Sequence, residues 1–231
     1  MLVIAHRGAS GEFNEGTKSA YLAAIKQGAD SLECDLRLTK DNQIICFHDR
    51  STKRLHNLDL DIAKSRYKEL TQGLDIFRFE ELLKLAINNK KSLLIEFKHP
   101  VPTGGKVERL THRLLKAYQG EIKKSGIKIE LISFSYLATL RNIFLSKGLF
   151  QSGLLINNKI YAKLIPTKLA VFDIKFLRAN PLLGYRCKKK GMRFYIYTAN
   201  TADDLKFAKE IGADGVITDY PQRARKLLGY P

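Results

Sequence analysis

The sequence predicts a TIM (β/α)8 barrel with a β-hairpin extension after its second strand. Eight short apolar runs are typical of strands, a stretch of helical periodicity follows each of them, and the whole alternation fits within 231 residues. The rival is an open doubly wound sheet, which usually has a glycine-rich turn after its first strand. The first strand here ends in His6-Arg7-Gly8, which is not such a turn. We therefore expect a single barrel domain over residues 1–231.

The expected elements follow from the order of apolar and polar residues. The first strand covers residues 2–5, and a helix follows that Thr17 caps and Gly28 closes. The second strand, 31–35, continues into the hairpin, and a polar connection with a short helix at 64–70 comes next. The later helices are expected at 79–88, 107–119, 137–145, 162–167, 181–190, 202–211 and 221–228, and the later strands at 93–97, 129–133, 151–156, 169–174, 193–197 and 215–218.

Residues 33–49 have the pattern of a β-hairpin. Apolar and polar residues alternate on both sides of a Lys-Asp-Asn turn signal. With Asp41 and Asn42 as the two turn residues, Asp35 lies directly opposite His48. Opposed residues have Cβ atoms only about 5 Å apart. The hairpin is therefore expected to bring an acid and an imidazole together.

Two carboxylates leave one face of the same strand. Glu33 and Asp35 are two residues apart, so their side chains point to the same side, and Cys34 points away from them. Close carboxylates repel one another unless a proton or a cation lies between them. Oxygen ligands of this kind suit Mg²⁺ or Ca²⁺ better than zinc. The pattern predicts a metal site, and the alternative is an exposed hairpin with ordinary charges.

Composition limits the partners. The net charge of +17 favours anionic substrates or anionic membrane surfaces, or it reflects lysines spread over solvated helices. The basic residues are scattered without an aromatic-basic motif, so we expect no dedicated nucleic-acid partner. No apolar run approaches the roughly 18 residues of a membrane span, although peripheral membrane contact is compatible with the charge. Three cysteines without metal-ligand spacing predict no disulfides and a cytoplasmic setting, and the oligomeric state stays open.

Barrel enzymes have their reacting groups at the C-terminal ends of the strands. The polar and aromatic residues at such positions are His6, Arg7, Glu33, Asp35, Glu96, Lys98, Ser133, Phe134, Tyr197, Asn200 and Asp219. Three carboxylates for a hard cation, with Arg7 and Lys98 beside them, suit a phosphate diester. Two histidines, the second being His48 of the hairpin, supply a general base and a general acid. Phosphodiester cleavage is the expected reaction class.

At these positions the sequence resembles the glycerophosphodiester phosphodiesterase family, whose members are TIM barrels. The resemblance runs in family order over nearly the whole chain, from residue 3 to about 222. The matching stretches are His6-Arg7-Gly8, Glu15-Gly16-Thr17, Glu33-Cys34-Asp35 through His48-Asp49, Ile95-Glu96-Phe97-Lys98, Tyr197-Thr198-Ala199-Asn200 and Ile217-Thr218-Asp219-Tyr220-Pro221.

The resemblance implies metal-dependent hydrolysis of a small-molecule glycerophosphodiester to an alcohol and glycerol 3-phosphate. In the implied reaction the glycerol 2-hydroxyl attacks phosphorus, and water then opens the cyclic phosphate. The implied metal ligands, for Ca²⁺ or Mg²⁺, are Glu33, Asp35 and Glu96, and the implied acid–base pair is His6 and His48. The implied phosphate and substrate contacts are Arg7, Glu15, Lys98, Phe134, Tyr197 and Asn200.

The chain departs from the family pattern at several places. Asn14-Glu15-Gly16-Thr17 stands where the family usually has Pro-Glu-Asn-Thr, and Asp41-Asn42 replaces the usual Asp-Gly turn, which Asn tolerates because it accepts positive φ. Tyr197 replaces a frequent Trp. Residues 50–92, where many members insert a substrate-capping subdomain, are short, so we expect a minimal insertion and leave the alcohol of the substrate open.

Two other functions fit parts of this pattern. A phospholipase-D-like lyase of the sphingomyelinase D type shares the barrel and the histidine pair, but that group tends to have Asp as its third ligand and disulfides. Glu96 and the unpaired cysteines argue against it. A non-catalytic phosphate-binding module would not need all three acids and both histidines.

Overall fold

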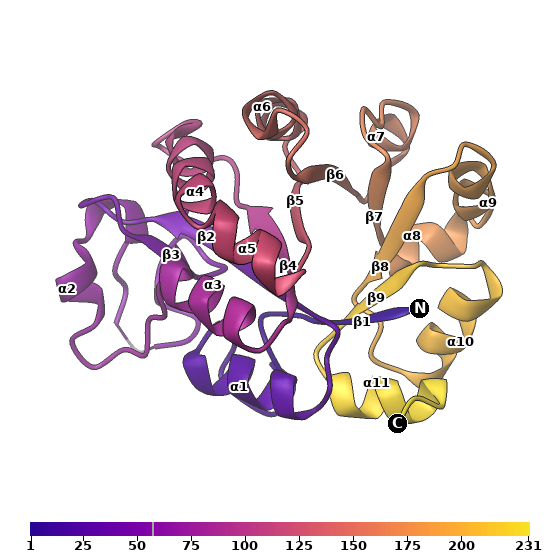
Figure 1. Ribbon diagram of the computed structural model, residues 1–231, viewed down its shortest axis with the longest axis horizontal. Coiled ribbons are helices and arrows are strands. Elements are labelled where there is room, and N and C mark those ends of the chain that lie inside the picture. The colour runs from indigo at the N-terminus through magenta and orange to yellow at the C-terminus, as the bar shows by residue number, and fades with distance from the viewer. Residues whose placement is uncertain (57) are drawn as a thin grey trace.

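The computed structural model describes residues 1–56 and 58–231 and contains a closed barrel of parallel strands (Figure 1). Pairing of the first strand with both the last and the second strand closes the ring. The predicted TIM (β/α)8 barrel is confirmed. The parallel strands are β1 (Leu2–Ala5), β2 (Ser31–Leu38), β4 (Ser92–Phe97), β5 (Ile129–Ser133), β6 (Gln151–Ile156), β7 (Leu169–Asp173), β8 (Arg193–Tyr197) and β9 (Gly215–Thr218), and β3 (Ile44–Cys46) extends β2 as an antiparallel hairpin.

Helices surround the strands on the outside (Figure 1). Side-chain oxygens cap the first turns of several of them: Thr17 accepts from the amide of Ala20, and Ser135 accepts from that of Ala138. The helices are α1 (Lys18–Lys26), α3 (Phe79–Asn88), α4 (Lys106–Ala117), α5 (Gln119–Ser125), α6 (Tyr136–Ser146), α7 (Lys159–Lys163), α8 (Ile174–Ala179), α9 (Leu182–Lys189), α10 (Ala202–Glu210) and α11 (Pro221–Leu228).

Strand side chains alternate between the barrel interior and the layer under the helices. Cys34 is buried among the residues of that outer layer, whereas its neighbours Glu33 and Asp35 approach Glu96 on the other side of β2, as predicted. The apolar residues that fill the barrel interior are Ile4, Leu94, Ile132, Leu155, Leu169, Val171, Tyr195 and Ile217. This filling makes the barrel a packed core rather than a pore.

The hairpin exists, but its predicted register was wrong by one residue. Leu38 pairs with Ile44, so Asp35 lies opposite Phe47, whose amide donates to the Asp35 carbonyl over 2.9 Å. His48 is therefore one position further along. Within a strand, a slip of one residue turns the side chains to the other face. His48 lies beyond the last paired residues, so the slip does not determine the direction of its side chain.

The slip arises from a three-residue loop. The amide of Thr39 donates to the carbonyl of Gln43, and the amide of Asn42 donates back to the carbonyl of Thr39. Asn42 adopts φ 64°, the left-handed conformation that three-residue hairpin loops require. The Thr39 hydroxyl adds a hydrogen bond to Asp41 and accepts one from the amide of Gln43. The loop thus contains residues 40–42 rather than two turn residues.

The helix expected at 162–167 was also misplaced, because it begins and ends earlier. The side chain of Asn158 accepts from the amide of Tyr161 over 3.0 Å and starts α7 at Lys159. Pro166 has no amide hydrogen to donate and disfavours helical geometry in the residue before it. The connection from β6 to β7 therefore contains one short helix followed by extended chain.

Other element boundaries also differ from expectation. The short helix at 64–70 is two pieces, a 3₁₀ turn η1 (Ile62–Lys64) and α2 (Tyr67–Leu70). The helix at 107–119 ends two residues early, and the additional helix α5 follows it. The strand at 169–174 ends at Asp173, whose carboxylate accepts from the amide of Phe176 and starts α8.

The insertion after the hairpin is small. Its apolar side chains pack against the hairpin, and α2 lies beside β3 at the edge of the molecule (Figure 1). The buried members of this cluster are Ile45, Phe47, Ile62, Leu70 and Ile76. The insertion thus lies on the hairpin side of the barrel as a satellite cluster.

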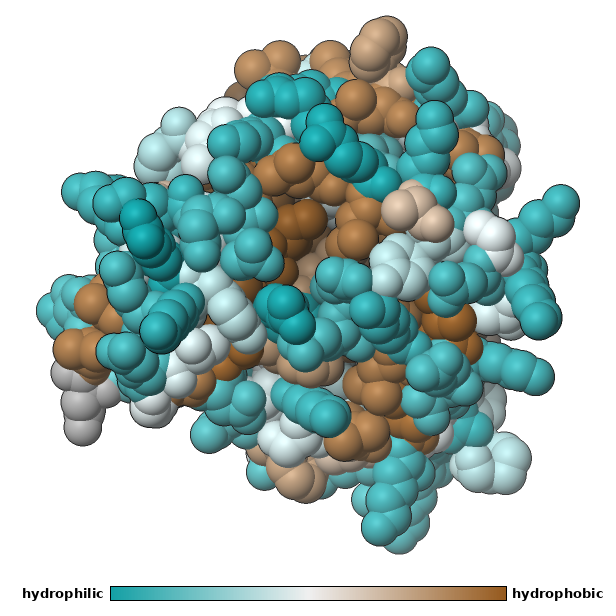
Figure 2. Space-filling view, turned by 60° about the vertical axis from the view of Figure 1, so that its left-hand side comes forward, coloured by the Kyte–Doolittle hydropathy of each residue, from teal (hydrophilic) through white to brown (hydrophobic). Residues whose placement is uncertain are grey.

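Hydrophilic side chains cover most of the face in Figure 2, and hydrophobic ones gather in a central hollow. None of the described helices combines the length and the apolar character that a membrane crossing requires. Cys34, Cys46 and Cys187 are free and buried.

Candidate active site

A cavity of about 200 Å³ lies at the C-terminal ends of the barrel strands. Its apolar wall comes from Ile132, Leu155 and Ile217 of the barrel interior. Its remaining lining residues are the polar and aromatic His6, Arg7, Glu33, His48, Glu96, Lys98, Phe134, Tyr197 and Thr198. The structure therefore brings eight of the eleven predicted site residues to one cavity.

Three buried carboxylates meet beside this cavity. Oxygens of Glu33, Asp35 and Glu96 all lie within 4.8 Å of one another. Asp35 and Glu96 are direct neighbours on the paired strands β2 and β4. Both carboxylate oxygens of Asp35 are buried and have ion-pair contacts with Arg7 and Lys98, without a hydrogen bond of good geometry among the described residues. An all-oxygen set of this kind fits a hard divalent cation such as Ca²⁺ or Mg²⁺.

Burial sets the protonation of this cluster. It raises the pKa of Glu33 well above its usual range, and together with the charge of Asp35 it raises the pKa of Glu96 to about 8. Burial also disfavours ionised Asp35, but the charges of Lys98 and Arg7 outweigh it and hold the pKa of that carboxyl well below its usual range. The cluster therefore disfavours three simultaneous negative charges unless a cation lies among them.

Arg7 adopts an unusual backbone conformation that aims it at the carboxylates. Its φ of 56° is left-handed, and such strain is typical of functional sites. Its amide donates to Glu33 over 2.9 Å, and its Nε lies 2.8 Å from an oxygen of Asp35. Lys98 completes the cationic side, with Nζ 2.6 Å from Glu96 and 3.2 Å from Asp35.

Glu15 lies at the edge of the site rather than in the cavity wall. It accepts a hydrogen bond from Arg7 over 3.0 Å. The following Gly16 has φ 72°, and its amide donates to the carbonyl of Arg7. Glycine and asparagine both tolerate this conformation, which explains why Gly16 can stand where the resembling family usually has Asn.

Each histidine of the cavity is held by a carboxylate. Nδ1 of His6 lies 2.6 Å from Asp219, and Nδ1 of His48 lies 2.7 Å from Asp49. Holding Nδ1 in this way fixes the ring and leaves Nε2 for the cavity that both rings line. Burial lowers the pKa of His48 despite the nearby Asp35. Two oriented imidazoles beside a carboxylate cluster are suited to general acid–base catalysis.

A chain of ion pairs joins one histidine to the carboxylate cluster. Asp49 accepts from Nε of Arg54 over 2.5 Å, and the same guanidinium donates to Glu15 over 2.6 Å. Glu15 in turn contacts Arg7. The orientation of His48 is thereby coupled to the position of Arg7.

Sequence reasoning missed the roles of Asp49, Arg54 and Asp219. Asp49 directly follows His48, and Asp219 directly follows β9, so both stand at positions where a side chain reaches the strand ends. Arg54 lies in the polar insertion and has no signal of its own in the sequence.

The predicted aromatic and amide contacts have different surroundings. Phe134 and Tyr197 meet edge to face with ring centroids 5.9 Å apart, and both line the cavity. Asn200 instead supports Asp219: its side-chain amide donates to the carboxylate over 2.5 Å, and its carbonyl oxygen accepts from the Asp219 backbone over 2.9 Å. A contact of Asn200 with substrate stays a prediction.

Comparisons with known proteins agree with this geometry. The family model described as the glycerophosphoryl diester phosphodiesterase family matches residues 6–223. A Bacillus subtilis protein provisionally named a glycerophosphodiester phosphodiesterase is 31% identical, covering 96% of this chain and 95% of its own length. A human protein named lysophospholipase D is 27% identical, covering 97% of this chain and 85% of its own.

Solved structures show the same fold. An Oleispira antarctica phosphodiesterase, described in complex with its product sn-glycerol-3-phosphate, superposes with a TM-score of 0.82 at 22% identity, covering 99% of this chain and 97% of that one. The family match spans the cavity residues from His6 to Ile217 and also includes Asp219. The chain therefore belongs to the glycerophosphoryl diester phosphodiesterase family and is an enzyme of that class.

Proposed function

We propose that this protein, acting as one domain, hydrolyses glycerophosphodiesters to an alcohol and glycerol 3-phosphate by metal-dependent His/His catalysis. One observation supports the proposal most strongly: His6 and His48 line one cavity beside three buried carboxylates, and each ring is held by its own aspartate. A non-catalytic phosphate-binding module would need the cations but not two oriented imidazoles.

The metal would be held by Glu33, Asp35 and Glu96. The convergence of three buried carboxylates and their all-oxygen donor set support this assignment. A bound Ca²⁺ or Mg²⁺ would supply charge neutralisation at a phosphate oxygen and lower the pKa of a hydroxyl group. The choice between the two ions is left to experiment.

The remaining groups bind the diester and move protons. Arg7 and Lys98 form charge-assisted hydrogen bonds with the phosphate oxygens. One histidine accepts the proton of the glycerol 2-hydroxyl as that oxygen attacks phosphorus, and the other donates a proton to the departing alcohol. In the second step water attacks the cyclic phosphate with the two proton roles reversed. Fixing both imidazoles through Nδ1 keeps Nε2 in place for each transfer.

A second candidate substrate class is lysophospholipids at a membrane surface, with the protein in peripheral contact. Helices α6 and α7 begin just beyond strands that end at the cavity, and their first turns expose Leu137 and Ile160 by 65% and 68%. The relative named lysophospholipase D favours the same class. Free cysteines support a reducing, cytoplasmic location.

A phosphorus NMR assay tests the mechanism. Glycerophosphocholine, glycerophosphoethanolamine and a lysophospholipid would each be supplied with Ca²⁺ or Mg²⁺. We expect a transient cyclic glycerol phosphate and loss of turnover with a chelator. The matched control is a 2-deoxy glycerophosphodiester, which keeps the phosphate contacts but lacks the nucleophile and should hardly react. Comparable turnover of the deoxy analogue would show that water attacks directly.

A further inference from the structure

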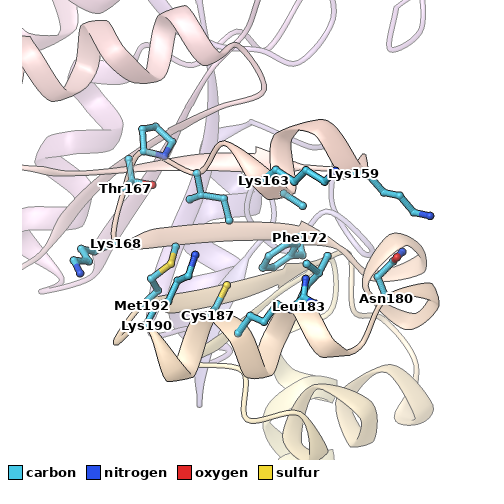
Figure 3. Close-up of a pocket in the computed structure, with 14 residues that line it drawn as sticks. Lys159, Lys163, Thr167, Lys168, Phe172, Asn180, Leu183, Cys187, Lys190 and Met192 are labelled. Atoms are coloured by element: carbon cyan, nitrogen blue, oxygen red, sulfur yellow. The ribbon is translucent and has the colours of Figure 1, made fainter.

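A second, larger cavity of about 700 Å³ lies outside the barrel, between α7 and α9 (Figure 3). Its size falls within the roughly 300–1,000 Å³ of ligand pockets. None of its lining residues lines the active-site cavity. The groove is therefore a separate feature of the surface.

The groove exists because α7 is short. It has 5 residues, whereas the barrel helices α6 and α9 on either side of it have 11 and 8. After Lys163 the chain returns to β7 without helix, through Pro166. A full-length helix would cover the outer face of β7, and here that space stays open between its neighbours.

The inner wall of the groove is apolar. Phe172 of β7, Leu183 and Cys187 of α9, and Met192 face the space between the two helices (Figure 3). Phe172 and Met192 form its buried floor, whereas Ile165 and Leu183 keep part of their surface accessible to a ligand. Methionine adapts to irregular apolar ligands. This wall suits a flexible hydrocarbon.

The rim of the groove is cationic. No carboxylate lines it, and among the described residues none of the five cations forms an ion pair with an acidic side chain. All five are exposed. They are Lys159, Lys163, Lys168, Arg186 and Lys190.

The two uncharged polar side chains of the groove each donate a hydrogen bond to the backbone. The Thr167 hydroxyl donates to the carbonyl of Leu169 over 2.7 Å, and the Asn180 side chain donates to that of Phe176 over 2.9 Å. The groove offers few directional contacts for reading a base or a sugar. The groove can therefore bind a ligand mainly through its apolar area and its positive charge.

We propose that this groove binds an anionic single-chain amphiphile, with the hydrocarbon against Ile165 and Leu183 and the carboxylate or phosphate head among the lysines. The charge complementarity and the apolar wall together select this chemistry. Two sources share it, a free fatty acid and a phosphate-headed lysolipid. The site does not depend on the reaction assigned to the barrel cavity.

Calorimetric titration of the full chain below the critical micelle concentration tests the proposal. Dodecanoate and dodecyl phosphate are the two probes, and monododecanoyl glycerol is the uncharged control. We expect one site, affinity that rises with chain length by up to about fourfold per methylene, and weakening as salt increases. Tighter binding of either anion identifies the source.

Matched variants place the site. K163E/K190E puts two negative charges on the rim, and A162F fills the groove, so each should reduce affinity at least tenfold. K123E/K124E makes the same charge change on the exposed end of α5 and should leave binding unchanged. Thermal unfolding checks that each variant is folded.

Equal binding of the uncharged glyceride, or equal loss in K123E/K124E, would overturn the proposal. So would binding that survives A162F in a folded protein. Association with anionic vesicles in the absence of any binding of the monomeric probes would likewise reject the groove and assign the charge to a membrane surface.

Discussion

Replacing Asp219 by Asn tests how strongly one carboxylate determines the geometry of His6. Asp219 accepts hydrogen bonds from Ser10 and Asn200 and lies 2.6 Å from Nδ1 of His6. Burial disfavours its charge, but the contacts with His6, Asn200 and Ser10 outweigh this and hold its pKa at about 2, against 3.8 for an ordinary aspartate. At about 1.4 kcal/mol per pH unit, the difference amounts to roughly 2 kcal/mol.

The sign follows from the lowered pKa. The stabilisation is fully present above pH 4 and disappears as the pH falls toward 2. In D219N at neutral pH we expect a loss on the order of 2 kcal/mol, which for a chain of this size lowers Tm by about 4–8 °C. The amide can present an N–H where His6 needs an acceptor, so kcat should fall about 10²–10⁴-fold.

The assay combines steady-state release of choline from glycerophosphocholine with a thermal melt. The matched control is Asp214→Asn at the other end of β9. Asp214 is equally exposed, at 27%, and accepts from the amide of Phe194 and from Lys188. This control should lose stability while kcat stays unchanged. A folded D219N enzyme with kcat within about threefold of wild type, or an equal kinetic loss in D214N, would refute the assignment of His6.

Three further predictions concern the metal cluster, a turn and the second histidine. The metal-free protein should lose stability as the pH rises from about 5 to about 8, because the pKa of Glu96 is raised and the folded state must give up a proton in this range. Ca²⁺ or Mg²⁺ should cancel this dependence of stability on pH, and Glu96→Gln should flatten it. A melting temperature that does not change with pH would contradict the assignment. Gly8→Ala should lower the free energy of unfolding by about 1–3 kcal/mol more than Gly73→Ala in denaturant titrations. Both positions have φ above 80°, but only a methyl group added at Gly8 would meet a backbone atom, at 2.6 Å. Equal losses in the two variants would exclude the clash. His48→Ala should lose about 10²–10⁴ in turnover and His112→Ala almost nothing, and equal losses in the two variants would reject His48 as an acid–base group.

The barrel could be predicted because its signal is repeated along the chain. Strand bounds such as those of β5, β6 and β9 follow from apolar runs, and agreement among eight units compensates for weak individual signals. The hairpin register could not be predicted, because a two-residue and a three-residue loop around Asn42 leave the same alternation of residues. The hydrogen bonds of the Thr39 hydroxyl with Asp41 and Gln43 support the three-residue loop in the folded chain.

The site was predictable where a residue type and a strand end coincide. Glu33, Asp35 and Glu96 were found in this way, and the structure places them together. Arg54 was not found, because it is far from Glu15 in the sequence and reaches it only through the way in which the insertion folds back. Supporting residues of this kind lie in no recognisable sequence pattern, and only their contacts in the folded protein distinguish them.

The contact between His6 and Asp219 spans 213 residues of sequence and relies on β1 pairing with β9. At a synthesis rate of roughly 5–20 residues per second, the last strand emerges about 10–40 s after the first. Until then β1 lacks one partner and presents an apolar strand edge, the kind of surface on which nascent chains aggregate. Half of the acid–base machinery is thus assembled only when the chain is nearly finished, so a partly made polypeptide has no working active site.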